Sequence, residues 1–179
     1  MKLFRSALRS IPPLCLPLLL AACASGPGNG PRATAQLQPT TGNTASGTVS
    51  FVQKGDTVMV SGQIKGLKPN AEHGFHVHEK GDCSSGDGMS TGGHFNPDGK
   101  PHGNHSAVAH HAGDIPSLKA DAAGVATFSF ESKTFSVGAG VTDVIGRGLI
   151  VHRDPDDYTT QPTGNSGPRL ACAVITKAG

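Results

Sequence analysis

Alternation of hydrophobic and polar residues is the clearest pattern along this chain. Residues 48–53 read Thr-Val-Ser-Phe-Val-Gln and residues 57–64 read Thr-Val-Met-Val-Ser-Gly-Gln-Ile, with a Lys-Gly-Asp turn between them. Residues 125–130 alternate in the same way after the turn-forming Ala-Ala-Gly at 122–124. Successive side chains of a β-strand point to opposite faces, so this period predicts half-buried strands joined by tight turns.

Further strands are predicted at residues 75–79, 149–152 and 170–176. No segment keeps the apolar period of an amphipathic helix over a useful length. Short strands with connections rich in glycine and proline predict an all-β domain, either a sandwich or a barrel.

Two stretches, residues 83–114 and 153–168, are too long and irregular to be simple turns. Long loops in a compact domain are usually either functional or disordered. The first stretch is rich in histidine, so metal coordination offers a way to order it without a core of its own.

The first 22 residues have the pattern of a secretory signal. Lys2, Arg5 and Arg9 supply a basic start, and a short apolar run at residues 11–20 follows. Prolines interrupt that run, and it is too short to span a bilayer as a stable helix. We therefore predict that residues 1–22 are a signal peptide.

The Leu-Ala-Ala-Cys sequence at residues 20–23 resembles the lipobox of bacterial lipoproteins, in which the cysteine is lipidated and becomes the first mature residue. We expect a lipid on Cys23, while cleavage at an unlipidated small-residue site is the alternative. Ala24 after the cysteine favours the outer membrane, with the domain held in the periplasm of the bacterial cell envelope.

The segment after Cys23 is rich in Gly, Pro, Ser and Asn and has no apolar period. It predicts a lipidated flexible tether over residues 23–33. A disordered terminus without an anchoring role has the same composition. Residues 34–179 are then enough for one domain with one core.

The charge balance argues against a nucleic-acid partner. The formal net charge is +2, but removal of Lys2, Arg5 and Arg9 takes the 15 basic residues to 12, against 13 acidic residues. The mature chain is therefore close to neutral, without the concentrated basic patch that nucleic-acid binding requires.

Histidines and one aspartate supply a candidate ligand set for two metal ions. Imidazole suits redox-active copper, while zinc accepts imidazole and carboxylate alike. Two four-coordinate sites need eight donor positions, so seven residues suffice if one imidazole bridges both metals through its two ring nitrogens. The set consists of His76, His78, His94, His102, His111, Asp114 and His152.

The sharpest local signal is the sequence Gly-Phe-His-Val-His-Glu at residues 74–79. On a strand, His76 and His78 project to one face, and Phe75 and Val77 project to the other, where a core would accept them. An isolated pair of this kind also fits two surface histidines. The histidines downstream favour a metal site.

Five segments, in order, resemble the copper/zinc superoxide dismutases, and the likeness extends from about residue 45 to residue 177. These segments are Gly-Phe-His-Val-His-Glu-Lys-Gly-Asp-Cys at 74–83, Gly-Gly-His-Phe-Asn-Pro at 92–97, His-Gly at 102–103 with His-Ala-Gly-Asp at 111–114, Gly-Leu-Ile-Val-His at 148–152, and Gly-Asn-Ser-Gly-Pro-Arg-Leu-Ala-Cys at 164–172. The resemblance implies an eight-stranded Greek-key β-barrel, or flattened sandwich, with two long functional loops.

The resemblance also implies a division of the ligands. Copper would take His76, His78, His94 and His152, and zinc would take His94, His102, His111 and Asp114. His94 would be the shared imidazolate and would deliver a proton during the reaction. The implied activity is disproportionation of superoxide to oxygen and hydrogen peroxide, with copper as the redox metal.

Other residues receive roles by the same resemblance. Asp156 matches a carboxylate that links copper and zinc ligands, although a solvated acidic turn is an alternative. Arg169 matches the arginine that acts on the substrate, although a surface salt bridge is an alternative. We expect His73 to make a structural hydrogen bond, and His105 and His110 to be solvated loop residues that could compete for metal.

The cysteines agree with an exported protein. Cys15 leaves with the signal and Cys23 is assigned to the lipid, so Cys83 and Cys172 remain as a pair in a compartment where disulfides persist. The resemblance places Cys172 at a disulfide position, and we expect the Cys83–Cys172 bond.

Two other functions compete with a superoxide dismutase that protects the envelope. A non-enzymatic exported copper/zinc-binding protein on the same fold would be expected to lack a copper ligand or the arginine. A zinc hydrolase needs an open zinc position, which four zinc ligands do not leave.

One segment departs from the familiar eukaryotic enzymes. The loop between Asp156 and Arg169 is shorter, and residues 159–162 read Thr-Thr-Gln-Pro in place of the charged residues that would steer the anion. The sequence therefore leaves substrate guidance open, and it is compatible with a homodimer as well as with a monomer.

Overall fold

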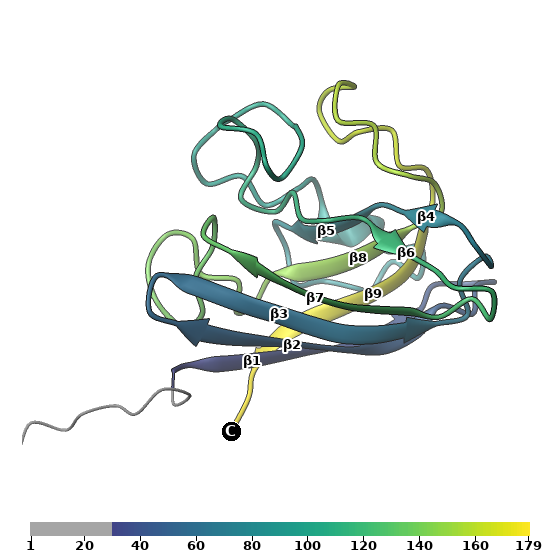
Figure 1. Cartoon of the computed structure of the whole chain (residues 1–179), viewed down its shortest axis with the longest axis horizontal. Coiled ribbons are helices and arrows are strands. Elements are labelled where there is room, and N and C mark those ends of the chain that lie inside the picture. Colours follow the sequence, from purple (N-terminus) through teal and green to yellow (C-terminus); the bar gives the residue numbers. More distant parts are fainter. Residues whose placement is uncertain (1–29) are drawn as a thin grey trace, which may run out of the picture.

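The computed structural model describes residues 30–179, which form an all-β domain (Figure 1). The one helical segment among these residues is a single 3-10 turn, η1 (Met89–Thr91). The strands are β1 (Arg32–Pro39), β2 (Ser46–Lys54), β3 (Thr57–Lys65), β4 (Glu72–His73), β5 (Phe75–His78), β6 (Leu118–Lys119), β7 (Ala126–Ser132), β8 (Gly148–His152) and β9 (Arg169–Lys177).

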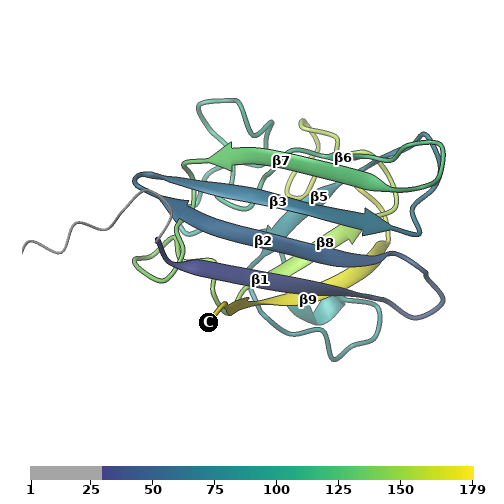
Figure 2. The same ribbon diagram turned by 60° about the horizontal axis from the view of Figure 1, so that its bottom comes forward.

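Seven of the strands form one curled antiparallel sheet in the order β5-β8-β9-β1-β2-β3-β7 (Figure 2). The remaining two strands pair with each other, Glu72 opposite Lys119 and His73 opposite Leu118. Because β4 continues into β5 after Gly74, and β6 lies against β7, this small pair connects the two edges of the large sheet. Counting β4 and β5 as one interrupted strand gives the eight strands expected of the barrel.

The apolar residues that alternate with polar ones in the sequence lie on the inner face of the curled sheet. Val49 and Phe51 of β2 and Val58, Val60 and Ile64 of β3 are fully buried. In β9 the buried alternate positions are Ala171, Ala173 and Ile175. The predicted strands at these positions are confirmed, and their apolar faces meet inside the curled sheet.

The first strand corrects the predicted start of the domain. Arg32 and Ala33 were assigned to the flexible tether, but β1 begins at Arg32, and Ala33 pairs with Phe51 in the core. Residue 31 is therefore the last position that the predicted tether can include, because Ala33 is 1% exposed and belongs to the sheet. The predicted signal peptide and the predicted lipidation at Cys23 lie outside the described residues.

The later part of the first long predicted loop (residues 83–114) and the second long loop (residues 153–168) rise on the same side of the domain, above β5 and β8 (Figure 1). The early part of the first loop, which carries η1, lies beside β9 (Figure 2). Within residues 30–179, no helix combines the length and apolar character needed to cross a bilayer.

The predicted disulfide joins Cys83, at the start of the first loop, to Cys172 of β9, with the two Cα atoms 5.9 Å apart. It ties the first loop to β9, which lies between β8 and β1 in the sheet.

Candidate metal centre

Strand β5 directs its two histidines away from the core, as its sequence predicts. Phe75 and Val77 belong to the hydrophobic core, whereas His76 and His78 face the loops. All four residues are fully buried, so the loops cover the histidine face. His152, at the end of the neighbouring strand β8, is 5% exposed and reaches the same place.

The first loop is attached to the free edge of β5 by backbone hydrogen bonds. Phe95 N–H donates to the Val77 carbonyl (2.8 Å), and Val77 N–H donates to the Gly113 carbonyl (3.0 Å). Gly113 must be glycine here, because a Cβ atom at this position would overlap the Val77 carbonyl. These bonds bring His94 and Asp114, which flank them in the sequence, opposite the strand histidines.

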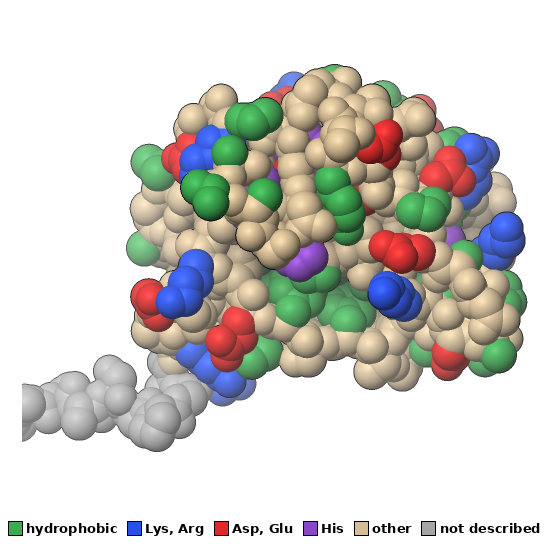
Figure 3. All heavy atoms as spheres, turned by 45° about the horizontal axis from the view of Figure 1, so that its top comes forward, with side chains coloured by type: hydrophobic (Ala, Val, Ile, Leu, Met, Phe, Trp, Pro, Cys, Tyr) green, Lys and Arg blue, Asp and Glu red, His purple; other side chains and the backbone are tan. Residues whose placement is uncertain are grey.

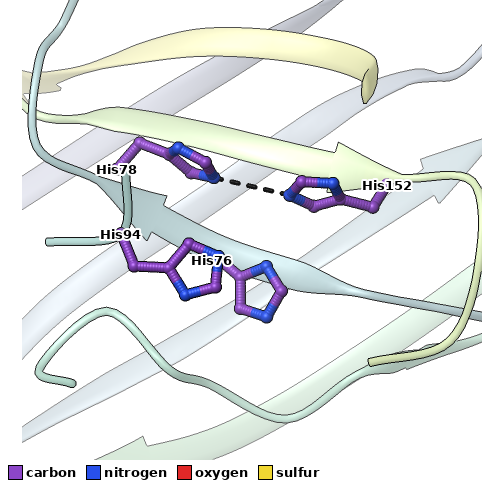
Figure 4. A group of neighbouring side chains, drawn as sticks. All are labelled: His76, His78, His94 and His152. Atoms are coloured by element: carbon purple, nitrogen blue, oxygen red, sulfur yellow. Dashed lines mark hydrogen bonds between the residues drawn. The ribbon is translucent and has the colours of Figure 1, made fainter. Parts of the chain in front are cut away.

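The first cluster, called here the four-histidine group, consists of His76, His78, His94 and His152 (Figure 4). One ring nitrogen from each lies within 4.8 Å of all the others. The Nε2 atoms of His78 and His152 face each other at 3.4 Å. The rings of His76 and His94 stack with centroids 3.9 Å apart.

The second ring nitrogens fix the orientation of these side chains. His78 Nδ1–H donates to the Gly92 carbonyl (3.0 Å), and His152 Nδ1–H donates to the Gly167 carbonyl (3.1 Å). A carbonyl can only accept, so both Nε2 atoms carry lone pairs that face each other. In residues 30–179, His76 Nδ1 and His94 Nε2 are buried with no hydrogen-bond partner. Four inward lone pairs without a donor are the arrangement that a cation satisfies.

Burial keeps these imidazoles neutral and able to act as ligands. Burial and the neighbouring His94 and His152 hold the pKa of His78 well below its usual range. Burial and His76 do the same to the pKa of His152. Burial and His76 lower the pKa of His94 to about 4, although Asp114 acts in the opposite direction.

The second cluster, called here the Asp114 group, consists of His94, His102, His111 and Asp114. Asp114 Oδ1 lies 2.8 Å from His94 Nδ1, 3.0 Å from His102 Nδ1 and 3.3 Å from His111 Nδ1. Its other oxygen accepts from the backbone N–H groups of His111 (2.9 Å) and Gly103 (3.1 Å). The carboxylate therefore organises its own loop as well as the three rings.

Mutual contacts favour the charged forms of His102, Asp114 and Asp156, although all three side chains are buried. Burial alone would lower the pKa of His102, but its hydrogen bonds to Asp114 and Asp156 outweigh burial and raise this pKa to about 10. Burial opposes ionisation of both carboxyls, yet their histidine partners hold the pKa values of Asp114 and Asp156 below the usual range. A metal ion bound among these groups would take the place of a proton on His102, so metal binding is expected to release protons.

Asp156 connects the two groups through their outer ring nitrogens. Its Oδ2 lies 3.0 Å from His76 Nε2, and its Oδ1 lies 3.2 Å from His102 Nε2. The Asp156 side chain is 1% exposed, so the alternative of a solvated acidic turn is wrong for this residue. A carboxylate behind a ligating histidine fixes ring orientation and raises its basicity.

The spacing of the donor atoms fits metal ions of ordinary size. With metal–nitrogen bonds of about 2.0–2.1 Å, neighbouring donors in a tetrahedral site lie roughly 3.3–3.4 Å apart. The Nε2 atoms of His78 and His152 are 3.4 Å apart, and the Nδ1 atoms of His94 and His111 are 3.5 Å apart. His94 contributes Nδ1 to the Asp114 group and has Nε2 left for the four-histidine group.

Arg169 lies beside the four-histidine group at the start of β9, opposite His152. Its guanidinium donates to the Gly88 carbonyl (2.5 Å), to Thr91 Oγ1 (2.6 Å) and to the Gly92 carbonyl (2.7 Å). Its charge helps to lower the pKa values of His78 and His152, which places it within electrostatic reach of them. It forms no ion pair that would make it a surface salt bridge in the described part of the chain.

The remaining histidines lie outside both groups. His73 is buried and bonds through Nδ1 to the His152 carbonyl (2.9 Å), which is the structural hydrogen bond expected of it. His105 is exposed, as expected, but His110 is 7% exposed and bonds to the His111 carbonyl, so the prediction of a solvated His110 is wrong. On the loop side of the molecule, histidine surface is visible chiefly as one patch near the centre of the view (Figure 3).

Sequence reasoning missed several groups that hold the site together. The carbonyls of Gly92 and Gly167 carry no side-chain signal at all. Thr91 was unnoticed, and Gln161, noted only as an uncharged loop residue, makes two hydrogen bonds to the backbone of His102.

The comparisons with known proteins agree with this geometry. The sequence model of the family described as copper/zinc superoxide dismutase (SODC) matches residues 45–175. A protein of Paramecium bursaria Chlorella virus 1 named superoxide dismutase (Cu-Zn) is 43% identical over 135 residues, which cover 72% of this chain and 71% of the viral protein. The crystal structure of the clock protein EA4 is similar with a TM-score of 0.75 at 39% identity, over 85% of this chain and 96% of the EA4 chain.

Proposed function

The chain belongs to the copper/zinc superoxide dismutase family, and on that premise we propose how its buried residues perform the reaction. The activity is disproportionation of superoxide to oxygen and hydrogen peroxide. We assign copper to the four-histidine group and zinc to the Asp114 group, with His94 as the ligand of both.

One observation carries this assignment. His94 belongs to both groups, and its two ring nitrogens have different surroundings: Nδ1 lies 2.8 Å from Asp114, while Nε2 is buried and unpaired within the described residues. An imidazole with both nitrogens committed to separate donor sets is what a bridging ligand requires. The purely nitrogen donor set suits redox-active copper, and the set with a carboxylate suits zinc.

When bound by the four-histidine group, copper would supply the one-electron chemistry by which superoxide is oxidised in one half of the cycle and reduced in the other. The protein residues supply position and protons. His78 and His152 are held by carbonyls, and His76 is held by Asp156, so the rings keep their lone pairs inward. His94 Nε2 is the atom at which a proton can be held and passed to the reduced product.

Arg169 has the chemistry of a guide for the substrate. Superoxide is a small anion, and a guanidinium attracts it and orients it through charge-assisted hydrogen bonds. Three hydrogen bonds to the loop hold this guanidinium beside His78 and His152.

We also propose that the enzyme works in the bacterial envelope, attached through a lipid on Cys23 with residues 1–22 removed. The signal pattern and the lipobox support this, as does the Cys83–Cys172 disulfide, since such bonds persist in oxidising compartments. Replacement of Cys23 by serine should release the protein from membranes or block its processing. Wild-type mature protein found wholly in the soluble fraction would contradict the anchor, and light scattering of the mature domain would show whether it forms a homodimer.

The activity is tested on the purified mature domain loaded with copper and zinc. We expect catalytic loss of superoxide with hydrogen peroxide as product, abolished in His152→Ala at equal zinc content. A fully metallated protein that leaves superoxide decay at its spontaneous rate would instead favour a metal-binding protein without this activity.

A further inference from the structure

Gln161, in the second long loop, is bonded to the backbone of His102 in the first. The His102 N–H donates to Gln161 Oε1 (2.9 Å), and Gln161 Nε2 donates to the His102 carbonyl (2.8 Å). The side-chain amide thus bonds to both backbone groups of a residue that lies 59 positions away in the sequence, as the backbone of a neighbouring β-strand does. Although Gln161 is exposed, both ends of its amide are committed to this contact.

The turn that carries Gln161 is fixed by its own hydrogen bonds. Asp157 accepts from the hydroxyls of Thr159 (2.6 Å) and Thr160 (2.5 Å). Gly164 N–H donates to the Thr160 carbonyl, and Asp157 N–H donates to the Gly164 carbonyl, each at 2.8 Å. The turn is therefore held by hydrogen bonds among its own residues, and these bonds fix the backbone that carries Gln161.

The same turn also packs on the ring of His102. A Cβ atom at Gly164 would lie 2.5 Å from His102 Nε2 and would overlap Asp156, so only glycine allows the turn to approach this closely. His102 is thereby held at Nδ1 by Asp114, at Nε2 by Asp156, and at its backbone by Gln161. The contact with Gln161 connects the two loops through the backbone of His102, whereas the contact with Asp156 does so through the His102 ring.

We propose that Gln161 is a positioning residue that latches the second loop onto the first and so controls how firmly His102 retains its metal. The inference rests on the proposed assignment of zinc to the Asp114 group. Departure of the metal requires His102 to move, and the two hydrogen bonds oppose the backbone displacement that would move it. The latch is a neutral amide, so its effect does not come from charge at the metal.

The experiment compares holoenzymes of wild type, Gln161→Ala and Gln161→Met, the last of which keeps the bulk of the side chain without its hydrogen bonds. Gln63→Ala is the matched control, because Gln63 is an exposed glutamine that bonds to Thr127 on the barrel. Zinc release to a chromogenic chelator at neutral pH is timed, and amide exchange at the His102 N–H is followed in the same proteins. Cobalt(II) placed in the Asp114 group reports changes in ligand geometry through its visible absorption.

Both Gln161 variants should release zinc about 10- to 100-fold faster than wild type, the effect typical of residues that support a metal ligand. His102 amide exchange should accelerate and the cobalt spectrum should change, while Gln63→Ala stays at wild-type values. Release, exchange and spectra equal to wild type in folded, disulfide-bonded Gln161 variants would overturn the latch. If His102→Ala retains zinc as wild type does, the ligand assignment itself fails, and the latch with it.

Discussion

His94 connects the two metal groups through a single side chain. Its Nδ1 is directed at Asp114 and its Nε2 at the four-histidine group, so its loss removes a donor from both. We predict that His94→Ala weakens copper and zinc binding together, whereas His152→Ala weakens copper mainly. Metal titrations with copper(II) electron paramagnetic resonance would measure this, and a His94→Ala protein whose copper signal still responds to zinc as in wild type would contradict bridging.

Arg169 has a local structural role beside the substrate role that we propose for it. The Gly92 carbonyl accepts from Arg169 Nη2 and from His78 Nδ1, so the guanidinium supports the residue that orients a copper ligand. A charge reversal therefore changes the attraction of the anion and disturbs the loop, whereas Arg169→Lys keeps the charge and loses the planar set of donors.

We predict that Arg169→Glu lowers the rate by roughly 10- to 100-fold at full copper occupancy, since local charge contributes to anion capture on this scale. Wild-type activity should fall as salt rises, because the Debye length shrinks from about 30 Å at 0.01 M to about 10 Å at 0.1 M. This dependence should flatten or reverse in Arg169→Glu and persist in Arg169→Lys, which keeps the charge. A metallated Arg169→Glu protein with the rate and salt response of wild type would exclude Arg169 from substrate capture.

At the scale of elements, the strands were predictable where large apolar residues alternate with polar ones. Strand β5 is the clearest case, because the period-two pattern separates its histidine face from its core face. Strand β1 was missed although it also alternates: its buried residues are Ala33, Ala35 and Leu37, and alanine is a weak strand signal. Its location beside the predicted tether hid the signal further.

The members of the two groups could be predicted from spacing and family resemblance, but the contacts that orient their side chains could not. The carbonyls of Gly92 and Gly167 set the tautomers of His78 and His152 through backbone atoms, which leave no mark in a sequence. The Gln161–His102 contact joins two loops whose relative position depends on the whole barrel. The position of Asp156 between His76 and His102 came from resemblance alone.

The disulfide stabilises the fold by joining two elements that are far apart in the sequence. Cys83 precedes η1, and Cys172 lies within β9, 89 positions away. The entropic model gives such a crosslink about 4–5 kcal/mol at most. We predict that the Cys83→Ser/Cys172→Ser double variant loses stability up to this limit in denaturant titrations, with a smaller loss for the metal-loaded protein. Equal stability of variant and wild type without metals would contradict this role.

At the scale of the whole molecule, the metals and the barrel stabilise each other. Seven buried side chains form the two groups, and the inward lone pairs of the four-histidine group have no hydrogen-bond donor within residues 30–179, so a bound cation would satisfy them. Ligand present at 1,000 times its dissociation constant adds about 4 kcal/mol, which corresponds to roughly 8–16 °C in Tm for a domain of this size. We predict a fall in Tm of at least this order on chelation, measured by calorimetry, and recovery on adding both metals. An unchanged Tm would mean that the groups do not bind metal in the folded protein.

Anomalous diffraction from crystals of the metal-loaded mature domain, recorded at the copper and zinc absorption edges, would locate both metals. We predict one copper peak enclosed by His76, His78, His94 and His152, and one zinc peak enclosed by His94, His102, His111 and Asp114, with His94 between the two peaks. A single peak, or two peaks that do not share His94, would contradict this prediction.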